Sequence, residues 1–254
     1  MAIDPLEQFK IEKVVSLPGF DIGGMHVDLS ITNSVLAMMI AVGLTLAFFT
    51  LTTLRASIIP GRGQAMAEGI FGLINDLTES IIGHDGKQFF PYVFTLFLFI
   101  LSCNLVGMFT YFTATSQVAV TLTLAAMTFT LVILVGFIRH GMGFFKMFLP
   151  SGVPLLIAPV IILIEIISFL VRPITLTLRL FGNMVGGHIV LKVFAGFILM
   201  AAGIGATGYL IGALSLGTMV ALTTLEFLVA YLQAFVFAVL ACVYISDVVN
   251  IGHH

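Results

Sequence analysis

The sequence has few charged residues for its length. Only 9% of its 254 residues are charged, whereas a soluble domain carries about 25%. Apolar residues make up 60% of the chain, and the mean hydropathy is +1.19. A soluble fold of this length could not bury so much apolar surface. The composition therefore excludes a soluble enzyme and a disordered protein, and the net charge of −2 argues against a nucleic-acid-binding protein. It predicts an all-α, polytopic membrane protein with a single membrane domain over residues 1–254.

Other features are absent as well. The two cysteines, Cys103 and Cys242, lie in apolar stretches without metal-ligand spacing, so we expect no metal and no cofactor. The first 28 residues contain neither the apolar core of a signal peptide nor an Arg-rich transit sequence. We therefore expect 1–28 to stay in the mature protein as an outer N-terminal segment. The sequence has no internal repeat, which argues against a transporter built from inverted repeats.

Long charge-free runs predict five transmembrane helices, since about 20 apolar residues span the hydrocarbon core. The predicted spans are 31–54, 89–111, 118–138, and two longer segments at 153–212 and 213–250. A polar stretch at 113–117 predicts the turn between the second and third spans. Glycines predict a break near 205–213 between the last two. Because these two exceed the length of a perpendicular helix, we expect a long tilted or bent hairpin over 153–250.

The segment after the first span has a different pattern. Apolar residues recur at helical spacing over 64–83, but Glu68, Asp76 and Glu79 interrupt them, which predicts one amphipathic interfacial helix. Lys and Arg are concentrated in the predicted loops 55–88 and 139–152. The positive-inside rule places both loops in the cytoplasm, with the N-terminus outside and the C-terminus cytoplasmic.

Ionisable residues within the last two spans are the most informative feature. Each costs about 2.5–3.5 kcal/mol at the membrane centre on insertion scales, so its presence favours an ion or proton path. The six are Glu165, Arg172, Arg179, His188, Lys192 and Glu226. The alternatives are long side chains that reach the interface, ion pairs that only orient helices and, for His188, a hydrogen-bonded core histidine.

The spacing of these residues predicts two polar routes. Glu165, Arg172 and Arg179 are seven residues apart and so lie within about 40° of one helix face. His188 follows nine residues later, half a turn around the helix and about 13.5 Å further along. Ser168, Thr175 and Asn183 lie near the first stripe, and Glu226 shares a face with Gln233 on the last helix. A fixed cation where the routes meet would repel a proton, and arginine stays protonated even when partly desolvated.

The same residues carry a resemblance to a known family. The run EIISFLVRPITLTLRLFGNMVGGHIV at 165–190 resembles the signature of the subunit a family of F-type ATP synthases. Residues 225–246 resemble the final helix of that family, and residues 100–111, which include Asn104, resemble its third helix. The resemblance covers most of the chain from about residue 30, and the RLFGN core with its leading arginine is highly specific.

The resemblance implies a proton-translocating subunit that has no active site of its own. Such a subunit stands beside a rotating ring of c subunits, and two offset half-channels couple the proton motive force to ATP synthesis. The implied partners are the c-ring, b-type peripheral stalk subunits, the rest of the synthase, the lipid bilayer and protons, with no nucleic acid. The implied location is a bacterial inner (plasma) membrane rather than a mitochondrial one.

Site roles also follow from position in the family motif. Arg179 matches the essential arginine that faces the ring carboxylates. Asn183 and Gln233 match polar residues beside it, and His188 and Glu226 match the pair of the outer half-channel. Some relatives carry that acid and histidine exchanged. The inner half-channel positions are Glu165, Ser168 and Arg172, with Thr175 near the same stripe.

Lys192 departs from the family pattern. It lies one turn past His188 and so shares its helix face. It either extends to the interface or pairs with Glu226; we include it, with Asn104, as a residue that tunes the path. The alternative functions are a proton-coupled secondary transporter and a structural membrane anchor. The RLFGN run and the later QAF run at 233–235 favour the rotary motor over both.

Overall fold

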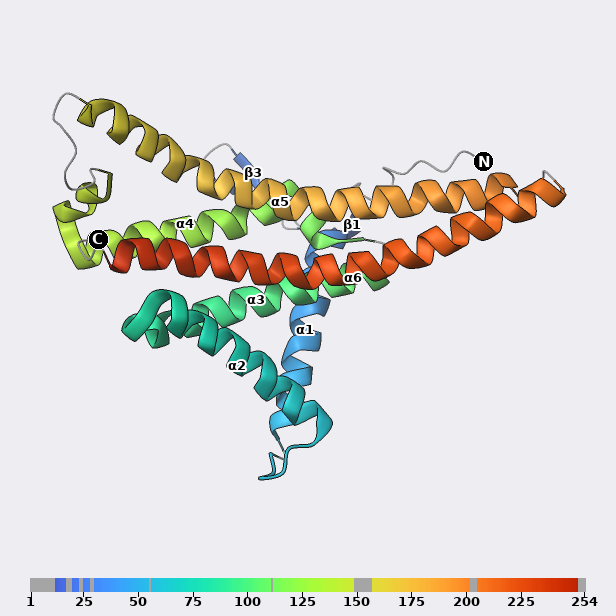
Figure 1. Cartoon of the computed structure of the whole chain (residues 1–254), viewed down its shortest axis with the longest axis horizontal. Coiled ribbons are helices and arrows are strands. Elements are labelled where there is room, and N and C mark those ends of the chain that lie inside the picture. The colour runs from blue at the N-terminus through green and yellow to red at the C-terminus, as the bar shows by residue number, and fades with distance from the viewer. Residues whose placement is uncertain are drawn as a thin grey trace. The chain divides into compact units, whose positions relative to one another are not determined.

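The computed structural model describes residues 12–16, 20–22, 25–27, 30–54, 56–110, 112–148, 157–201 and 205–250. Six α-helices account for most of them (Figure 1): α1 Asn33–Thr53, α2 Arg62–Ile82, α3 Gly86–Phe109, α4 Val118–His140, α5 Ala158–Ala201 and α6 Ala206–Val249. Short 3₁₀ helices lie between them: η2 Gly83–Asp85, η3 Ala114–Ser116 and η4 Gly141–Phe148. Within the described ranges, five helical segments are long and apolar enough to cross a membrane, so the prediction of a polytopic helical membrane protein is confirmed.

Helix boundaries lie close to the predicted ones, with one exception. The predicted break at 205–213 is placed too late, because α5 ends at Ala201 and α6 already begins at Ala206. Gly205 has a φ of 70°, a left-handed conformation that glycine adopts easily. Gly208 and Gly212 lie inside α6 instead, where each costs only about 1 kcal/mol relative to alanine. Glycine content alone therefore misplaced the turn.

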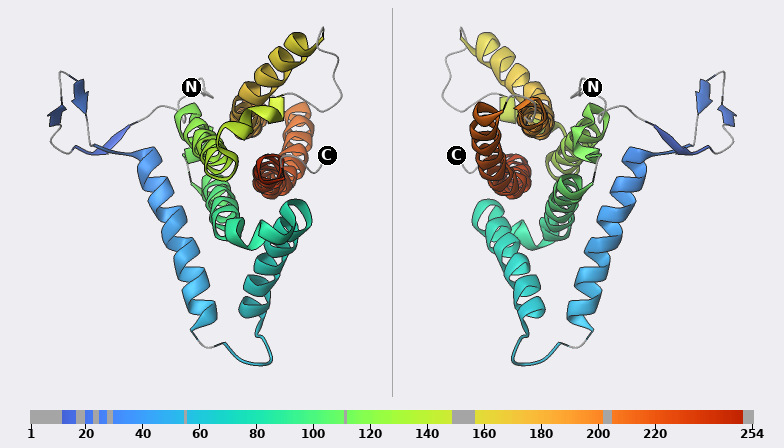
Figure 2. Two further views of the ribbon diagram at one scale, coloured as in Figure 1. Left: turned by 90° about the vertical axis from the view of Figure 1, so that its left-hand side faces the viewer. Right: turned by 90° about the vertical axis from the view of Figure 1, so that its right-hand side faces the viewer.

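Among the described residues, four short strands precede the first helix, and they were not predicted. Strand β1 (Lys13–Val15) pairs with β4 (Ile31–Thr32), and β2 (Phe20–Ile22) pairs with β3 (Met25–Val27), both antiparallel. Figure 2 shows β2 and β3 side by side. The rest of the predicted segment 1–28, Arg55 of the basic loop and residues 153–156 of the predicted hairpin lie outside the described residues.

The chain forms two compact units. Unit 1 consists of Met1–Leu46, Phe99–Gln117 and Leu180–Gln233, and unit 2 consists of Ala47–Leu98, Val118–Arg179 and Ala234–His254. Helices α1, α3, α5 and α6 each contribute one part to each unit. Polar residues of α5 and α6 therefore fall into two separate groups.

In unit 1, small residues bring helices close together. Ala41 of α1 packs on Cys103 and Val106 of α3, and Thr45 and Ser102 hydrogen-bond between the same helices at 2.5 Å. Small and hydroxyl-bearing residues are typical of helix contacts in membranes, where burial of apolar surface provides little driving force. The second part of α5 runs antiparallel to the first part of α6 (Figure 1).

In unit 2, aromatic rings and polar ties hold the helices. Phe71 of α2 packs on Phe90 and Phe94 of α3. Arg139 at the end of α4 pairs with Asp85 and donates to Gln88. Helix α2 buries Ala67, Ile74, Thr78 and Ile82, while its acidic residues Glu68, Asp76 and Glu79 are exposed. That pattern is amphipathic, and the interfacial position of α2 stays a prediction.

Candidate functional site

Unit 1 brings together four of the predicted site residues. Asn183 Nδ2 on α5 donates to Gln233 Oε1 on α6 at 2.8 Å. His188 Nδ1 lies 3.7 Å from Glu226 Oε1 on the same two helices. The helices run antiparallel, so the higher-numbered residue of α5 meets the lower-numbered residue of α6. We call these four residues the unit 1 cluster.

Both α6 members of the unit 1 cluster are buried. Glu226 is 7% exposed and Gln233 is 5% exposed. Within the described part of the chain, Glu226 Oε1 and Gln233 Nε2 have no hydrogen-bond partner. The 3.7 Å separation between His188 and Glu226 is longer than a hydrogen bond, and a small movement of either side chain would close it. Buried polar atoms without partners are costly, so Glu226 and Gln233 are candidates for a functional role.

Gly187 provides the space in which the Glu226 carboxyl group lies. A Cβ atom at Gly187 would stand 2.6 Å from Glu226 Oε1 and 3.2 Å from its carboxyl carbon. Any larger residue at position 187 would therefore displace the carboxyl group from His188. Gly187 is not among the sequence-predicted site residues, because its role depends on which residue of α6 faces it.

We expect Gly187→Ala to lower proton translocation by about ten-fold, because small displacements of a proton-transfer group are costly. The helix itself should tolerate the change, since alanine favours helix over glycine. The measurement is ATP-driven proton pumping in membrane vesicles, normalised to the amount of assembled complex. Gly196→Ala is the matched control, because nothing lies within 4 Å of a Cβ atom there. Equal pumping by both variants would contradict the assigned role.

A polar turn completes the surroundings of the unit 1 cluster. Thr113 Oγ1 lies 2.9 Å from His188 Nε2. Thr115 Oγ1 donates to Asn104 Oδ1 at 2.9 Å, and Asn104 Nδ2 donates to the Ala230 carbonyl at 3.2 Å. The sequence predicts 113–117 only as a turn, so Thr113 and Thr115 are not among the predicted site residues. The available signal was the run of polar residues at 113–117. A polar run between two apolar spans has the same sequence pattern whether its side chains face water or a buried histidine.

Lys192 lies on α5 one turn after His188 and is half-buried. The ion pair described for Glu226 is with His188. The pairing of Lys192 with Glu226 stays a hypothesis.

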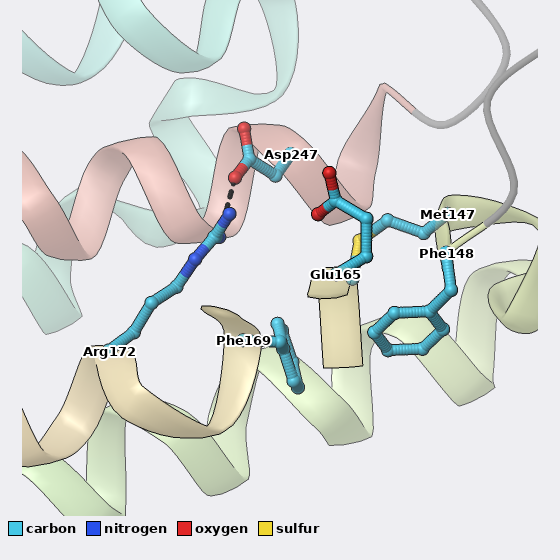
Figure 3. A pocket seen from close by; sticks show the side chains of 6 residues that line it. All are labelled: Met147, Phe148, Glu165, Phe169, Arg172 and Asp247. Atoms are coloured by element: carbon cyan, nitrogen blue, oxygen red, sulfur yellow. Dashed lines mark hydrogen bonds and ion pairs between the residues drawn. The ribbon is translucent and has the colours of Figure 1, made fainter. Parts of the chain in front are cut away.

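Unit 2 contains a second set of polar residues, which surrounds Arg172. The guanidinium of Arg172 pairs with Asp247 of α6 at 2.7 Å and lies over the ring of Tyr244, 5.0 Å from its centroid. The Arg172 side chain lines a cavity of about 200 Å³. Two acidic residues, Asp247 and Glu165, line the same cavity. Figure 3 shows the six lining residues, namely Met147, Phe148, Glu165, Phe169, Arg172 and Asp247. We call Glu165, Arg172 and Asp247 the unit 2 cluster.

Asp247 was not among the predicted site residues. The sequence contains little indication of a role for Asp247, because this residue lies three positions before the predicted end of the last span. A charged residue at such a position normally faces water. The structure does not bring Ser168 and Thr175 into the cavity. Both are exposed on α5, and the Thr175 hydroxyl donates to the Arg172 carbonyl at 2.9 Å.

Arg179 is exposed on α5. No residue in the described ranges forms an ion pair with it. An exposed cation in the middle of a long apolar helix is costly unless a group outside the chain faces it. Among the described residues, no group of three or more His, Cys, Asp or Glu side chains could hold a metal ion.

Comparison with known proteins identifies the family. The family model described as ATP synthase A chain matches residues 35–246. The chain belongs to the ATP synthase A chain family. It is 50% identical to ATP synthase subunit a of Sinorhizobium medicae and 49% identical to that of Rhizobium rhizogenes, in each case over the full length of both chains. It is 48% identical to that of Hyphomonas neptunium, covering 100% of this chain and 99% of the relative.

Membership confirms the resemblance and the general function. The chain is the proton-translocating membrane component of an F-type ATP synthase and works with the rest of that complex. Its apolar helices and its bacterial relatives place it in a bacterial inner membrane. The comparisons give no support to the alternative of a secondary transporter.

Proposed function

We propose that the two clusters belong to two separate half-channels for protons. The unit 1 cluster belongs to the route from the outer side, and the unit 2 cluster belongs to the route to the cytoplasm. The observation that carries this proposal is that α5 and α6 each contribute residues to both clusters. The contacts of the unit 1 cluster lie within unit 1, and those of the unit 2 cluster lie within unit 2. A continuous polar line would instead conduct protons without doing work.

The outer route uses groups that can bind and release a proton. A proton entering from outside reaches the buried carboxyl group of Glu226 and the imidazole of His188. Histidine titrates near working pH, and a carboxyl group in an apolar site binds protons readily. Asn183 and Gln233 hydrogen-bond to each other one to two turns further along, and the free amide group of Gln233 extends the polar path.

The inner route has a different charge pattern. Arg172 neutralises Asp247, and the aromatic rings of Phe169 and Tyr244 flank its guanidinium. Glu165 lines the same cavity and is left as the acid that can accept a departing proton. Ser168 and Thr175 lie on exposed positions of α5, which suits contact with a partner better than lining this cavity.

Arg179 separates the two routes and faces a rotating ring of c subunits. Its exposed guanidinium keeps a ring carboxylate ionised until a proton arrives from the outer route. The neutral carboxyl group can then turn into lipid, where a charged one would be strongly disfavoured. After almost a full turn it releases its proton to the inner route. In this arrangement the N-terminus is outside, the C-terminus is cytoplasmic, and b-type stalk subunits hold the chain still.

Cysteine accessibility tests the two routes directly. We expect a membrane-impermeant thiol reagent to label Asn183→Cys only from the outer side and Glu165→Cys only from the cytoplasmic side. The thiolate is the reactive form, so labelling requires water at the site. The unsubstituted chain is a suitable background, because Cys103 and Cys242 are 2% and 0% exposed.

The control is Leu163→Cys, which replaces an exposed apolar residue two positions from Glu165. On a lipid-facing surface it should stay unlabelled from both sides. Labelling of Asn183→Cys and Glu165→Cys from one and the same side would overturn the proposal of two separate routes.

A further inference from the structure

The hydroxyl group of Thr113 lies between His188 and a backbone carbonyl. Its Oγ1 atom is 2.9 Å from His188 Nε2 and 3.4 Å from the carbonyl oxygen of Gly107 on α3. Thr113 is 3% exposed, so water does not compete freely for these contacts. His188 Nδ1, on the opposite edge of the ring, is the atom that approaches Glu226.

A hydroxyl group can serve His188 in each of its protonation states, because it both donates and accepts. When Nε2 carries no proton, Thr113 donates to it, and the proton on Nδ1 points toward Glu226. When His188 is doubly protonated, Nε2–H donates to Thr113, and Thr113 donates to the Gly107 carbonyl. In both states Nδ1 keeps the same direction, so the imidazole need not rotate between receiving and releasing a proton.

We infer that Thr113 is a positioning residue that holds His188 Nδ1 toward Glu226 throughout the protonation cycle. The inference deepens the proposed function, because it rests on proton transfer through His188 and Glu226. The charged groups close to His188 are Glu226 from α6 and Lys192 from its own helix. Thr113 contributes no charge and acts only through the orientation of the ring.

The surroundings of Thr113 hold its hydroxyl group in place. Ser116 Oγ donates to the Thr113 carbonyl at 2.6 Å, and the bond from Thr115 to Asn104 ties the turn to α3. Asn104 in turn donates to the Ala230 carbonyl of α6, the helix that carries Glu226. Position 107 must be glycine for this approach, since a Cβ atom there would overlap the Thr113 side chain. Three buried polar residues, Ser116, Thr115 and Asn104, and one glycine thus hold the turn that carries this hydroxyl group, which is more than a connecting turn requires.

Thr113→Val is the decisive variant, because valine keeps the shape and removes the hydroxyl group. We expect ATP-driven proton pumping by the assembled complex in inverted vesicles to fall by roughly ten-fold. We also expect its pH profile to shift, because an imidazole that is free to rotate loses the approach of Nδ1 to Glu226, on which the protonation of both groups depends. Thr113→Ser keeps the hydroxyl group and should restore both. Thr78→Val is the matched control, since Thr78 is also fully buried and its hydroxyl bonds only to carbonyls of its own helix.

A second variant covers the case in which Thr113→Val does not assemble. Gly107→Ala pushes the Thr113 side chain away and should reproduce the loss of pumping and the shifted pH profile. Normal pumping with an unchanged pH profile in either assembled variant would overturn the inference. If Thr113→Val lowers pumping without moving the pH profile, the role is structural and the inference is also wrong.

His188→Ala separates failure of the inference from failure of the proposed function. If His188→Ala leaves pumping unchanged, proton transfer through this residue is wrong, and the inference fails with it. If His188→Ala lowers pumping while Thr113→Val does not, only the positioning role of Thr113 fails. The expected result is a loss in both variants, with the greater loss in His188→Ala.

Discussion

Replacing Arg179 with alanine is expected to lower ATP synthesis by about a hundred-fold or more, the usual scale for removing one preorganised charge from a functional site. Passive proton conduction through the same membranes should persist or rise. The guanidinium is exposed on α5 and has no ion-pair partner in the described ranges, so its charge is available to a ring carboxylate. In the proposed arrangement, its loss leaves no fixed cation to repel a proton that crosses from one route to the other.

A membrane potential supplies about 2.3 kcal/mol for each charge that crosses 100 mV. That energy reaches the rotor only if the direct path between the routes is closed. Arginine suits the barrier because its guanidinium stays charged, whereas a lysine in an apolar site can lose its proton. We therefore expect Arg179→Lys to retain little synthesis.

Membrane vesicles that contain the whole synthase provide both measurements. ATP synthesis is driven by an imposed proton gradient, and passive proton permeability is followed in the absence of nucleotides. Arg62→Ala makes the same substitution at an exposed position at the start of α2 and should behave as the unsubstituted protein does. Unchanged synthesis in Arg179→Ala would remove the basis for the separator role and for most of the proposed route.

Glu226→Gln should block the outer route, with ATP-driven pumping reduced by about a hundred-fold, the scale of losing one acid–base group. The amide has nearly the size and shape of the carboxyl group but cannot bind and release a proton. Glu226 is buried, and within the described residues it is the carboxyl group that pairs with His188. Passive permeability should not rise, because Arg179 is intact.

An exchange variant distinguishes chemistry from packing. Glu226→His combined with His188→Glu keeps one acid and one imidazole on the facing helices, as the family resemblance suggests is workable. We expect it to pump better than Glu226→Gln. Glu79→Gln is the control for the amide change, because Glu79 is exposed and its ion pair with Lys87 contributes little. Normal pumping in Glu226→Gln would show that protons do not pass through this carboxyl group.

Hydropathy predicted the transmembrane helices well, because a chain that crosses lipid must form regular hydrogen-bonded structure. A backbone inside a bilayer must satisfy its own hydrogen bonds, so an apolar run of sufficient length has to become a helix. The predicted 118–138 corresponds to α4 at Val118–His140, and the predicted 31–54 corresponds to α1 at Asn33–Thr53. The short strands between Lys13 and Thr32 were missed, because a polar segment is under no such constraint.

The ionisable residues could also be identified from the sequence. A charged residue within an apolar run stands out before its contacts in the folded structure are known. Their spacing indicated that Glu165 and Arg172 share a face, and both line one cavity. It could not indicate Asp247 as the partner of Arg172, because that contact joins residues 75 positions apart. Pairing across such a distance depends on the register between two helices, which one sequence does not display.

Composition and local spacing thus determined the helices, the polar residues and the family motif, because each depends on a residue and its near neighbours. Tertiary structure decided which groups touch. The packing of α5 on α6 places Gly187 against the Glu226 carboxyl group. The folding back of the 113–117 turn places the Thr113 hydroxyl group against His188. The physical reason is that proton-transfer groups need contacts within a few tenths of an ångström, and packing between distant segments sets those contacts.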